Sequence, residues 1–467
     1  MRYSKMLDFV TKILNDKSET PIDVCLNATM AREIEAWRDV YEDKASWLNA
    51  KQGIKSAGLA GSISAELARL VTIELRSEVT GNDFINSVYK AVLDDIRVQT
   101  EYACAGGGLV FKPYPTNEGV NVQFIRSDCF FPVFFDAAGN LTVSVFVDQF
   151  RAGKKIYTRL EIHSLDASTL QVQNYAFVSQ NKEFLGNEIQ LIDVPQWAKL
   201  EPVGVFNGVK KPLFGYFKIP LANTVDPDCP IGVSVFSRAL GLIAEADRRY
   251  SNECWEFEAT QAAVHIAESL LKRDKDSSKV VAPGGKERLY RQVEYSTGAT
   301  DKPLIDPFLP EIRFEAIQKG YQDQLKRIEF VCGLAYGTLS DPQVVDKTAE
   351  EIRFSKQRSY ATVTDIQTAL GKALTDLVDA IAFWVKKSGL GTEEPKLSIE
   401  WGDSILTDPE KTAARAMLER MNGITDDVKY FTDVYGLKEE AAKTLVADIA
   451  ARKTAMSEPP DVFGGGA

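Results

Sequence analysis

The chain has 467 residues, of which 45% are hydrophobic and 26% are charged, proportions close to those of folded soluble proteins. These values exclude a disordered chain and a collagen-like one, and the length allows roughly three domains of ordinary size. There are 55 Lys and Arg residues against 66 Asp and Glu, so the net charge is -11. A surface with this balance repels nucleic acid and disfavours tight binding of a duplex.

The cysteines and the N-terminal segment predict synthesis in a reducing cytosol. No C-x-x-C pair occurs, and wide spacing is typical of thiols that stay reduced. The N-terminal stretch MRYSKMLDFVTKILND is charged and amphipathic, and no run of eighteen apolar residues occurs. We therefore expect a chain that is neither secreted nor inserted in a membrane. The six cysteines are Cys25, Cys104, Cys129, Cys229, Cys254 and Cys332.

The first 218 residues divide into a helical part and a strand-rich part. Residues 1–104 carry apolar side chains at three- and four-residue spacing, notably over 34–40 and 84–102. A Gly-Gly-Gly run at 106–108 then stops the helix, and short alternating runs rich in Val, Phe, Tyr and Thr follow. The representative strands are VNVQFI, LTVSVFVDQF, KIYTRLEIHSL and LQVQNYAFV, separated by turn residues at 136–140 and 152–153.

A long helical hairpin is the main architectural prediction. Residues 233–273 contain no Pro and a single Gly, so they allow a helix of about 41 residues, roughly 60 Å long. Residues 274–310 are dense in Lys, Asp, Gly and Pro and predict an exposed excursion. The helical period returns over 311–334, which would rise roughly 36 Å and run back antiparallel. Such amphipathic helices need neighbours along their whole length.

The C-terminal part predicts one more long helix and a set of small ones. Residues 337–346 (GTLSDPQVVD) indicate a loop, and 347–387 a helix that is polar in its first half and apolar in its second. The stretch KLSIEWGD predicts a strand, and Asp408 with Pro409 marks a helix start. Helices over 412–421, 426–435 and 438–452 and a mobile tail follow. The expected fold class is α+β.

Candidate catalytic and metal-binding groups are sparse. The only histidines are His163 and His265, and neither has metal-ligand spacing, so structural or solvent-facing roles are favoured. The three-glycine run lacks the Lys and Ser or Thr of a phosphate loop; helix termination is favoured over an anion nest. Acid pairs at 226/228, 274/276 and 426/427 suit turns better than a divalent ion. We therefore expect no enzyme, no metal site and no cofactor.

The basic pairs at 248/249 and 326/327 leave two interpretations open. Both pairs lie within predicted helices, and acidic residues at 245, 247 and 329 can balance them. Salt-bridging faces, solvated or between subunits, are therefore favoured. Contact with passing phosphates is the alternative.

In the order of its elements and in several short sequence segments, the chain resembles the portal proteins of tailed bacteriophages. The first 230 residues resemble that family only in outline and in the order helix, GGG, LVFKPY. The resemblance is carried by residues 233–441, in the pieces HIAESLLKRDKD, PEIRFEAIQKGYQDQLKRIEFVCGLAYGTLSD, KTAEEIRFSKQRSYATVTDIQTAL and SIEWGDSILTDPEKTAARAMLERMNGITDDVKYF.

The resemblance implies a portal-type ring subunit, typically one of twelve, at one vertex of the virion head. Double-stranded DNA would pass through the ring non-specifically during packaging, retention and ejection. The implied parts are a wing (1–230), stem helices (231–273 and 311–336), a clip (274–310), a tunnel loop (337–346), a long kinked helix (347–388), a wing return strand (389–407), a crown (408–455) and a mobile tail (456–467).

The resemblance also implies partners and sites. The ring would meet the terminase large subunit, a head-completion or adaptor protein, and the major capsid and scaffolding proteins, with assembly in the host cytoplasm and no membrane contact. The implied DNA-channel residues of the tunnel loop are Gln343, Val344, Val345 and Lys347. The implied partner residues of the clip are Arg288, Tyr290 and Arg291. Uncharged side chains at 343–345 would slide on a duplex without phosphate contacts.

Two rival functions follow from the same residues. One is another structural protein of the phage head or neck, for which a similar composition is ordinary. The other is a packaging nuclease or ATPase, which would need a phosphate loop or clustered carboxylates in a strand-rich core. Neither motif is visible in the sequence, so the structural interpretations are favoured.

Overall fold

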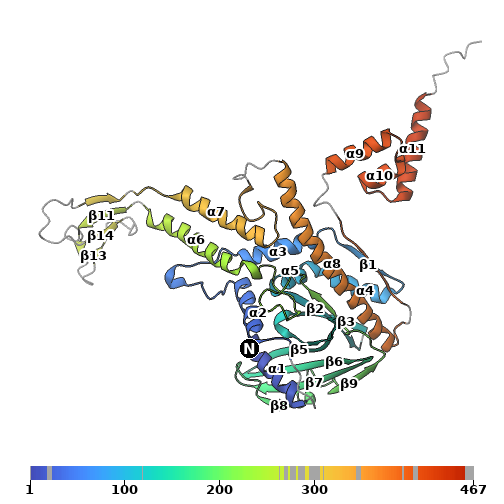
Figure 1. The fold of residues 1–467 in the computed structure, drawn as a ribbon, viewed down its shortest axis with the longest axis horizontal. Coiled ribbons are helices and arrows are strands. Elements are labelled where there is room, and N and C mark those ends of the chain that lie inside the picture. The colour runs from blue at the N-terminus through green and yellow to red at the C-terminus, as the bar shows by residue number, and fades with distance from the viewer. Residues whose placement is uncertain are drawn as a thin grey trace, which may run out of the picture. The chain divides into compact units, whose positions relative to one another are not determined.

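The computed structural model describes residues 2–17, 24–117, 119–261, 263–267, 272–273, 280–281, 290–293, 305–308, 310–342, 349–391, 394–402 and 409–457 (Figure 1). The chain divides into two compact units, residues 1–400 and 401–467. Helices and strands are both abundant and largely segregated along the chain, which confirms the α+β class.

Five helices and a short strand form the N-terminal part of the first unit. Asn27 and Asn82 cap two of the helices, because each side chain accepts a hydrogen bond from a backbone N–H in the first turn. The predicted helix over 84–102 is interrupted near Asp95. The elements are α1 (Tyr3–Lys17), α2 (Ala28–Tyr41), η1 (Ala50–Gln52), α3 (Leu59–Thr72), β1 (Arg76–Thr80), α4 (Asp83–Asp94) and α5 (Ile96–Gly106).

The three-glycine run ends α5 and starts a strand, as predicted. Gly107 has φ of 85°, and a Cβ there would lie 2.6 Å from the carbonyl oxygen of Gly232. The backbone therefore needs glycine both for its left-handed conformation and for the close approach of another segment. The strands of the sheet that follows are β2 (Gly108–Thr116), β3 (Gly119–Arg126) and β10 (Gly215–Lys218), in the order β10-β2-β3.

A larger antiparallel sheet confirms the predicted strand-rich region. Its strands are β4 (Phe130–Phe135), β5 (Leu141–Ala152), β6 (Lys155–Asp166), β7 (Thr169–Ser179), β8 (Asn187–Ile189) and β9 (Val203–Asn207). Short 3-10 helices, η2 (Ser127–Cys129) and η3 (Leu191–Asp193), flank them. Asp136 organises the predicted turn by accepting hydrogen bonds from the backbone of Ala138 and Asn140. Phe130, Phe146 and Phe214 pack together in the core.

A buried ionic cluster lies on this sheet. Glu161 accepts hydrogen bonds from Arg159 at 2.9 Å and from His163 at 2.7 Å, and it pairs with Lys112. Burial alone would raise the pKa of Glu161, but these neighbours outweigh it and hold that pKa well below its usual range. Burial lowers the pKa of His163. This histidine thus has the structural role favoured by the sequence.

The predicted hairpin is present, but its first helix is much shorter than expected. Helix α6 covers Leu240–Ala259, 20 residues instead of about 41, after the 3-10 helix η4 (Ser237–Ala239). Val264 and Ile266 alternate along β11 (Ala263–Ala267), which pairs with β14 and β15. The prediction rested on the absence of helix breakers; strand pairing overrode it. His265, expected in the helix, therefore lies in a strand.

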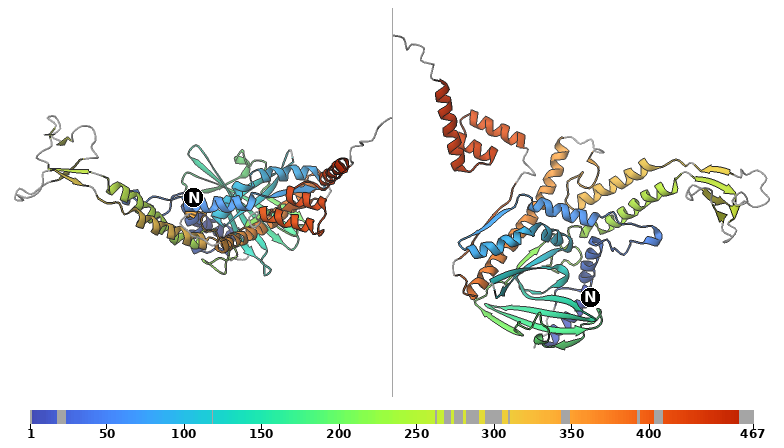
Figure 2. Two further views of the ribbon diagram at one scale, coloured as in Figure 1. Left: turned by 90° about the horizontal axis from the view of Figure 1, so that it is seen from above. Right: turned by 180° about the vertical axis from the view of Figure 1, so that it is seen from behind.

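The returning helix α7 covers Phe314–Val331 and lies beside α6 in both views of Figure 2. The expected excursion between the two helices contains short strands. They are β12 (Lys272–Arg273), β13 (Val280–Val281), β14 (Tyr290–Val293) and β15 (Ile305–Phe308). The predicted antiparallel hairpin with an intervening segment is confirmed. Helix α6 ends earlier in the sequence, and α7 begins later, than predicted.

The third long helix, α8 (Ala349–Lys387), has 39 residues and confirms its prediction. Its second half is strongly buried: Leu370, Leu374 and Leu377 are completely covered. The chain then forms β16 (Lys396–Glu400), which pairs antiparallel with β1 from the N-terminal part. The return strand is therefore where the sequence predicted it.

The described residues of the second unit form three helices, as predicted. They are α9 (Pro409–Met421), α10 (Asp427–Tyr435) and α11 (Glu439–Ser457). Asp426 caps α10 by accepting from the backbone of Lys429, and Gly436 ends it with φ of 65°. Arg420 joins α9 to α10 through a hydrogen bond of 2.6 Å to Asp427.

Candidate functional site: the α6–α7 hairpin and the loop after it

Polar contacts fix the register of the hairpin. Arg249 on α6 donates to the carbonyl oxygen of Gly320 on α7 at 2.6 Å. Nearer the body, Gln324 donates to the carbonyl oxygen of Leu242 at 3.0 Å. Residue numbers rise along one helix as they fall along the other, so the helices are antiparallel. One face of each helix is buried, at Ile243, Ala246, Leu325 and Ile328.

The far end of the hairpin is closed by a bidentate ion pair. Arg313 donates to the two carboxylate oxygens of Glu256 at 3.0 and 2.8 Å, and its backbone N–H donates at 3.2 Å. The hydrogen bonds from Arg313 lower the pKa of Glu256. This pair holds the two chain segments at the point where α6 ends and α7 begins.

The near end of α6 is tied to the N-terminal part of the same unit. Asp247 accepts hydrogen bonds from the indole of Trp47 and from the backbone of Ala57, both at 2.8 Å. One turn on, Ser251 accepts from the backbone of Lys55 at 2.9 Å. Burial raises the pKa of Asp247, and these hydrogen bonds counter it. The hairpin therefore leaves the body from a fixed base.

A buried carboxylate organises the loop after α7. Glu329 has no exposed surface, and its side chain accepts from the backbone N–H groups of Gly337, Leu339 and Ser340 at 3.1, 2.6 and 2.8 Å. The hydroxyl of Ser340 donates to the same carboxylate at 2.9 Å. A buried acceptor with several donors is a rigid arrangement, because each lost bond leaves a buried polar group unpaired. Residues 337–340 are thus fastened to α7.

Two further contacts hold the same loop. Gln322 accepts a hydrogen bond from the backbone of Asp341 at 2.7 Å. From α8, the guanidinium of Arg358 lies over the ring of Phe330 at 4.1 Å and over that of Tyr336 at 6.0 Å. The predicted loop over 337–346 is therefore confirmed in its described part. The predicted channel residues Gln343, Val344, Val345 and Lys347 lie outside the described residues.

The predicted clip residues fall on a small three-stranded sheet. Tyr290 and Arg291 begin β14, where they stand opposite Val264 and His265 of β11 in a parallel pair. The third candidate, Arg288, lies outside the described residues. The strand order is β14-β11-β15.

Large apolar side chains remain exposed on the hairpin. Trp255 is 64% exposed, Phe257 47%, Ile312 50% and Phe330 53%. The first three lie near the far end of the hairpin and Phe330 near its base. Exposed apolar side chains of this size make the hairpin a candidate for contact with another protein surface.

Arg248, Arg249 and Lys326 of the basic pairs are ion-paired within their own helices. Arg248 and Arg249 both reach Glu245, at 3.5 and 3.3 Å. Lys326 lies 3.9 Å from Asp323, whereas Asp247 and Glu329, which were expected to balance these pairs, bind Trp47 and the loop after α7. The salt-bridge interpretation is therefore confirmed for these three side chains.

The acid pairs serve turns and caps where the structure describes them. Asp226 accepts from the side chain of Asn27, and Asp426 is the cap of α10. The pair at 274/276 lies outside the described residues. Within the described part of the chain, no cluster of three His, Cys, Asp or Glu residues has the arrangement of a metal site. Nor do the described helices include one with the length and apolar content to span a bilayer.

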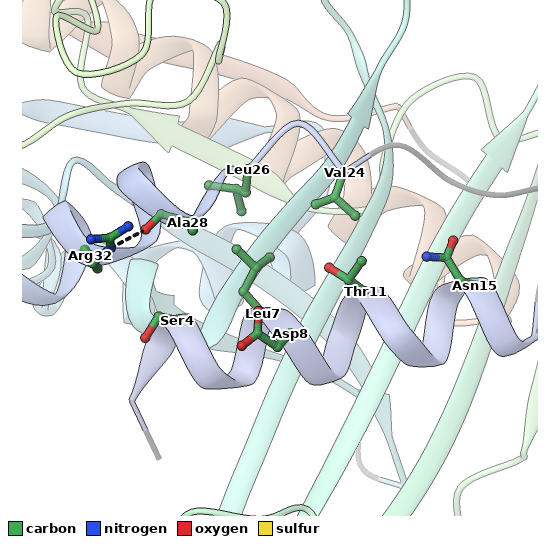
Figure 3. A pocket seen from close by; sticks show the side chains of 9 residues that line it. All are labelled: Ser4, Leu7, Asp8, Thr11, Asn15, Val24, Leu26, Ala28 and Arg32. Atoms are coloured by element: carbon green, nitrogen blue, oxygen red, sulfur yellow. Dashed lines mark hydrogen bonds between the residues drawn. The ribbon is translucent and has the colours of Figure 1, made fainter.

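A cavity of about 530 Å³ lies between α1 and the segment that leads into α2 (Figure 3). Among the described residues that line it, Asp8 and Arg32 are charged and none is His or Cys. Arg32 is engaged with the carbonyl oxygen of Ala28 at 3.1 Å. The described lining thus contains neither paired carboxylates nor a histidine that could act as a base.

Comparison with known proteins identifies the family. Residues 94–434 match the family described as "Phage portal protein, SPP1 Gp6-like", and the chain belongs to that family. Its role is that of a phage portal, the connector between head and tail. No curated protein matches.

Two solved structures match most of the length of this chain at low sequence identity. One is described as the neck of a native GTA particle computed with C12 symmetry; it is 12% identical, with a TM-score of 0.39, over 85% of this chain and 92% of that one. Another is described as the neck of an empty GTA particle computed with C6 symmetry; it is 13% identical, with a TM-score of 0.37, over 87% and 94%.

Proposed function

We propose that this portal subunit assembles into a closed ring, of about twelve copies as is typical of the family, around a channel for double-stranded DNA. The exposed apolar surface of the α6–α7 hairpin is the observation that carries the proposal. A two-helix hairpin buries only one face of each helix, and the remaining apolar side chains need a neighbour. Copies related by rotation supply that neighbour to every subunit at once.

We assign the parts of the ring as follows. Residues 1–230 with β16 form the wing, α6 and α7 the stem, β11 to β15 the clip, and residues 409–457 the crown. The tunnel loop is residues 337–346, whose first residues Glu329 fastens to α7, and α8 follows it. On this assignment the Glu329 hydrogen bonds hold the entry to the narrowest part of the channel in a fixed place.

We propose a structural role without catalysis at one vertex of the virion head. The clip would dock the terminase large subunit during packaging and the head-completion or adaptor protein afterwards, with Arg288, Tyr290 and Arg291 among its contacts. The major capsid and scaffolding proteins would contact the ring during assembly in the host cytoplasm. The net charge of -11 supports passage of DNA over tight binding.

Negative-stain images and mass photometry of the purified chain test the ring. We expect annular particles with a central hole and a mass of about twelve subunits. A strictly monomeric compact particle at micromolar concentration would overturn the proposal. Hydrolysis of ATP by the purified chain, abolished by substitutions within it, would overturn the non-catalytic role.

The channel is tested at Val344 and Val345. Replacing both with Lys places two rings of positive charge where uncharged residues are proposed, and each ring would bind backbone phosphates. Packaging and genome retention in infected cells should change, whereas the double change to Thr, which adds no charge, should be tolerated. Unchanged packaging and retention in the Lys variant would count against a channel-lining position.

A further inference from the structure

A pair of cysteines joins two segments of the first unit that are far apart in sequence. Cys25 precedes α2, and Cys229 lies in the loop between β10 and α6. The side chains of Cys25 and Cys229 influence each other's ionisation directly, and the two segments are joined by the hydrogen bond from Asn27 to Asp226. Cys25 is half-buried, whereas Cys229 is 2% exposed, and both are free thiols. None of the contacts of the hairpin or its loop involves either residue.

The backbone around both cysteines is fixed by other hydrogen bonds. The N–H of Cys25 donates to Val133 on β4 at 2.9 Å, and its thiol donates to the carbonyl oxygen of Pro132 at 3.3 Å. On the other side, the N–H of Cys229 donates to Asp226 at 3.1 Å, and the carbonyl oxygen of Cys229 accepts from Asn223 at 3.2 Å. The backbone at each cysteine is therefore held in place.

Two contacts bridge the segments on either side of the pair. Asn27 donates to the carboxylate of Asp226 at 2.6 Å, and the side chain of Asn223 lies 3.6 Å from the sulfur of Met30. The two segments are therefore aligned over several residues, not only at the sulfur atoms. Prior alignment of the backbone is the geometric condition for a disulfide to form without distortion.

We propose that Cys25 and Cys229 are a thiol-exchange site, which a low-molecular-weight disulfide such as oxidised glutathione converts into an intramolecular disulfide. In the first step the thiolate of Cys25, the more exposed thiol, attacks oxidised glutathione, forms a mixed disulfide and releases one glutathione. In the second step the thiolate of Cys229 attacks the Cys25 sulfur and releases the second glutathione. The two protein thiols lose two electrons and two protons, which end as two glutathione thiols.

The arrangement of the two segments favours the second step. The contact with Cys229 together with burial raises the pKa of Cys25, so the first exchange, which is bimolecular, is slow. The second exchange is intramolecular, between side chains on segments that other contacts already hold together, so it is fast. The glutathione adduct on Cys25 therefore does not accumulate in the unaltered chain.

The consequence is a redox-dependent clamp that is independent of ring formation. The chain is made where thiols stay reduced, and a particle released from a cell meets a more oxidising medium. Closing the bond would tie the segment before α2 to the loop before α6. Because about 200 residues separate the two cysteines, the cross-link restricts the unfolded chain strongly.

Peptide mapping of the full-length protein without reduction tests the proposal. After incubation of the native protein with oxidised glutathione and digestion with trypsin, residues 18–32 and 219–238 should appear as one linked species. The midpoint of thermal unfolding should rise by roughly 5 °C, and dithiothreitol should reverse the rise. A linked species that forms only in urea, or none at all, would overturn the proposal.

Three variants separate the steps. Cys229→Ser should accumulate glutathione on Cys25, because the resolving thiol is missing, and Cys25→Ser should give neither product. Cys254→Ser removes a half-buried thiol elsewhere, on α6, and should behave like the unaltered chain. Equal modification of Cys25 in the unaltered chain and in Cys229→Ser would show that the two thiols do not react with each other. The mapping of the unaltered chain stands even where a variant folds poorly.

Discussion

Arg313 donates to both carboxylate oxygens of Glu256 at 3.0 and 2.8 Å and so closes the far end of the α6–α7 hairpin. The two residues are separated in sequence by the whole set of strands β11 to β15. Their geometry is a parallel two-bond fork, which constrains direction as well as distance. The strands therefore begin and end at one fixed point, whatever partner they meet.

Replacing Glu256 with Gln should loosen that point. A neutral amide cannot form the charge-assisted fork, so amide hydrogen exchange in the first turn of α7 should become several-fold faster. The lowered pKa of Glu256 predicts full protection above about pH 4.5 and a loss as the pH falls through the lower folded-state value. Glu258→Gln, an exposed change on the same helix, should leave exchange unaltered. Equal exchange in both variants would contradict the clamp.

Replacing Glu329 with Ala should release the loop after α7. Three backbone N–H groups and the Ser340 hydroxyl would lose their acceptor inside the protein, at a cost of roughly 1–3 kcal/mol for each group that stays buried. We expect hydrogen exchange at 337–340 to rise by at least about tenfold. Glu315→Ala removes an exposed carboxylate from the same helix and is the matched control. A loop that stays protected in the Glu329 variant would show that other contacts hold it.

Replacing Trp255 with Glu should weaken the ring. A charge on the exposed apolar surface must be desolvated when a neighbouring copy covers it, and an unpaired buried charge costs several kcal/mol. Mass photometry should find smaller assemblies at the same concentration. Ile192→Glu changes an even more exposed apolar residue, 70% exposed and far from the hairpin, and should leave the assembly intact. Rings of normal mass in both variants would place the subunit contact elsewhere.

The elements that the sequence predicted well are those whose local pattern and tertiary role agree. The apolar second half of α8 and the glycines at 106–108 both belong to this group, because the packing around them requires the conformation that these residues prefer. The first stem helix was predicted about twice too long, since the absence of Pro does not specify a helix when Val264 and Ile266 can join a sheet. Strand pairing between residues that are far apart in the sequence leaves no local pattern from which it could be predicted.

Replacing Gly107 with Ala should destabilise the first unit far more than replacing Gly139 with Ala. Both glycines have positive φ, 85° and 79°, so both changes carry the strain of a left-handed backbone, about 1 kcal/mol. Only at Gly107 does the new Cβ meet another backbone, 2.6 Å from the Gly232 oxygen; nothing lies within 4 Å at Gly139. Urea unfolding should separate the two by roughly 2 kcal/mol or more. Equal losses of unfolding free energy in the two variants would mean that the segment around Gly232 moves to accommodate the new Cβ.

The buried cluster around Glu161 predicts acid sensitivity of the first unit. The pKa of Glu161 is depressed, so its contribution is present above about pH 4.5 and is lost as the pH falls through the folded-state value. The pKa of His163 is also lowered in the folded chain. As the pH falls below about 6.5, the unfolded chain therefore binds a proton before the folded chain does, and the free energy of unfolding decreases. His163→Gln should remove the dependence that begins near pH 6.5. Urea midpoints measured from pH 7 to 4 check both windows.

The candidate site was only partly visible in the sequence. The hairpin and its loop followed from periodicity and turn residues, but Glu256 was not predicted to matter. Asp247 and Glu329 were expected only to balance the basic pairs, whereas Asp247 holds the base of the hairpin and Glu329 holds the loop. The sequence feature that these residues share is a carboxylate next to buried positions, as where Glu329 follows Ile328. Only the structure shows the hydrogen-bond donors that stabilise such a carboxylate. Contacts between residues distant in sequence decide these roles.

The pairing of β1 with β16 has a consequence for synthesis on the ribosome. The partner of Arg76–Thr80 is Lys396–Glu400, so β1 emerges long before the strand that completes its sheet. At about 5–20 residues per second, the wait lasts roughly 15–60 s. During that interval the nascent chain carries an unpaired strand edge, and chaperones or neighbouring nascent chains can reach it. The first unit is finished only when the chain has been translated almost to its final helices.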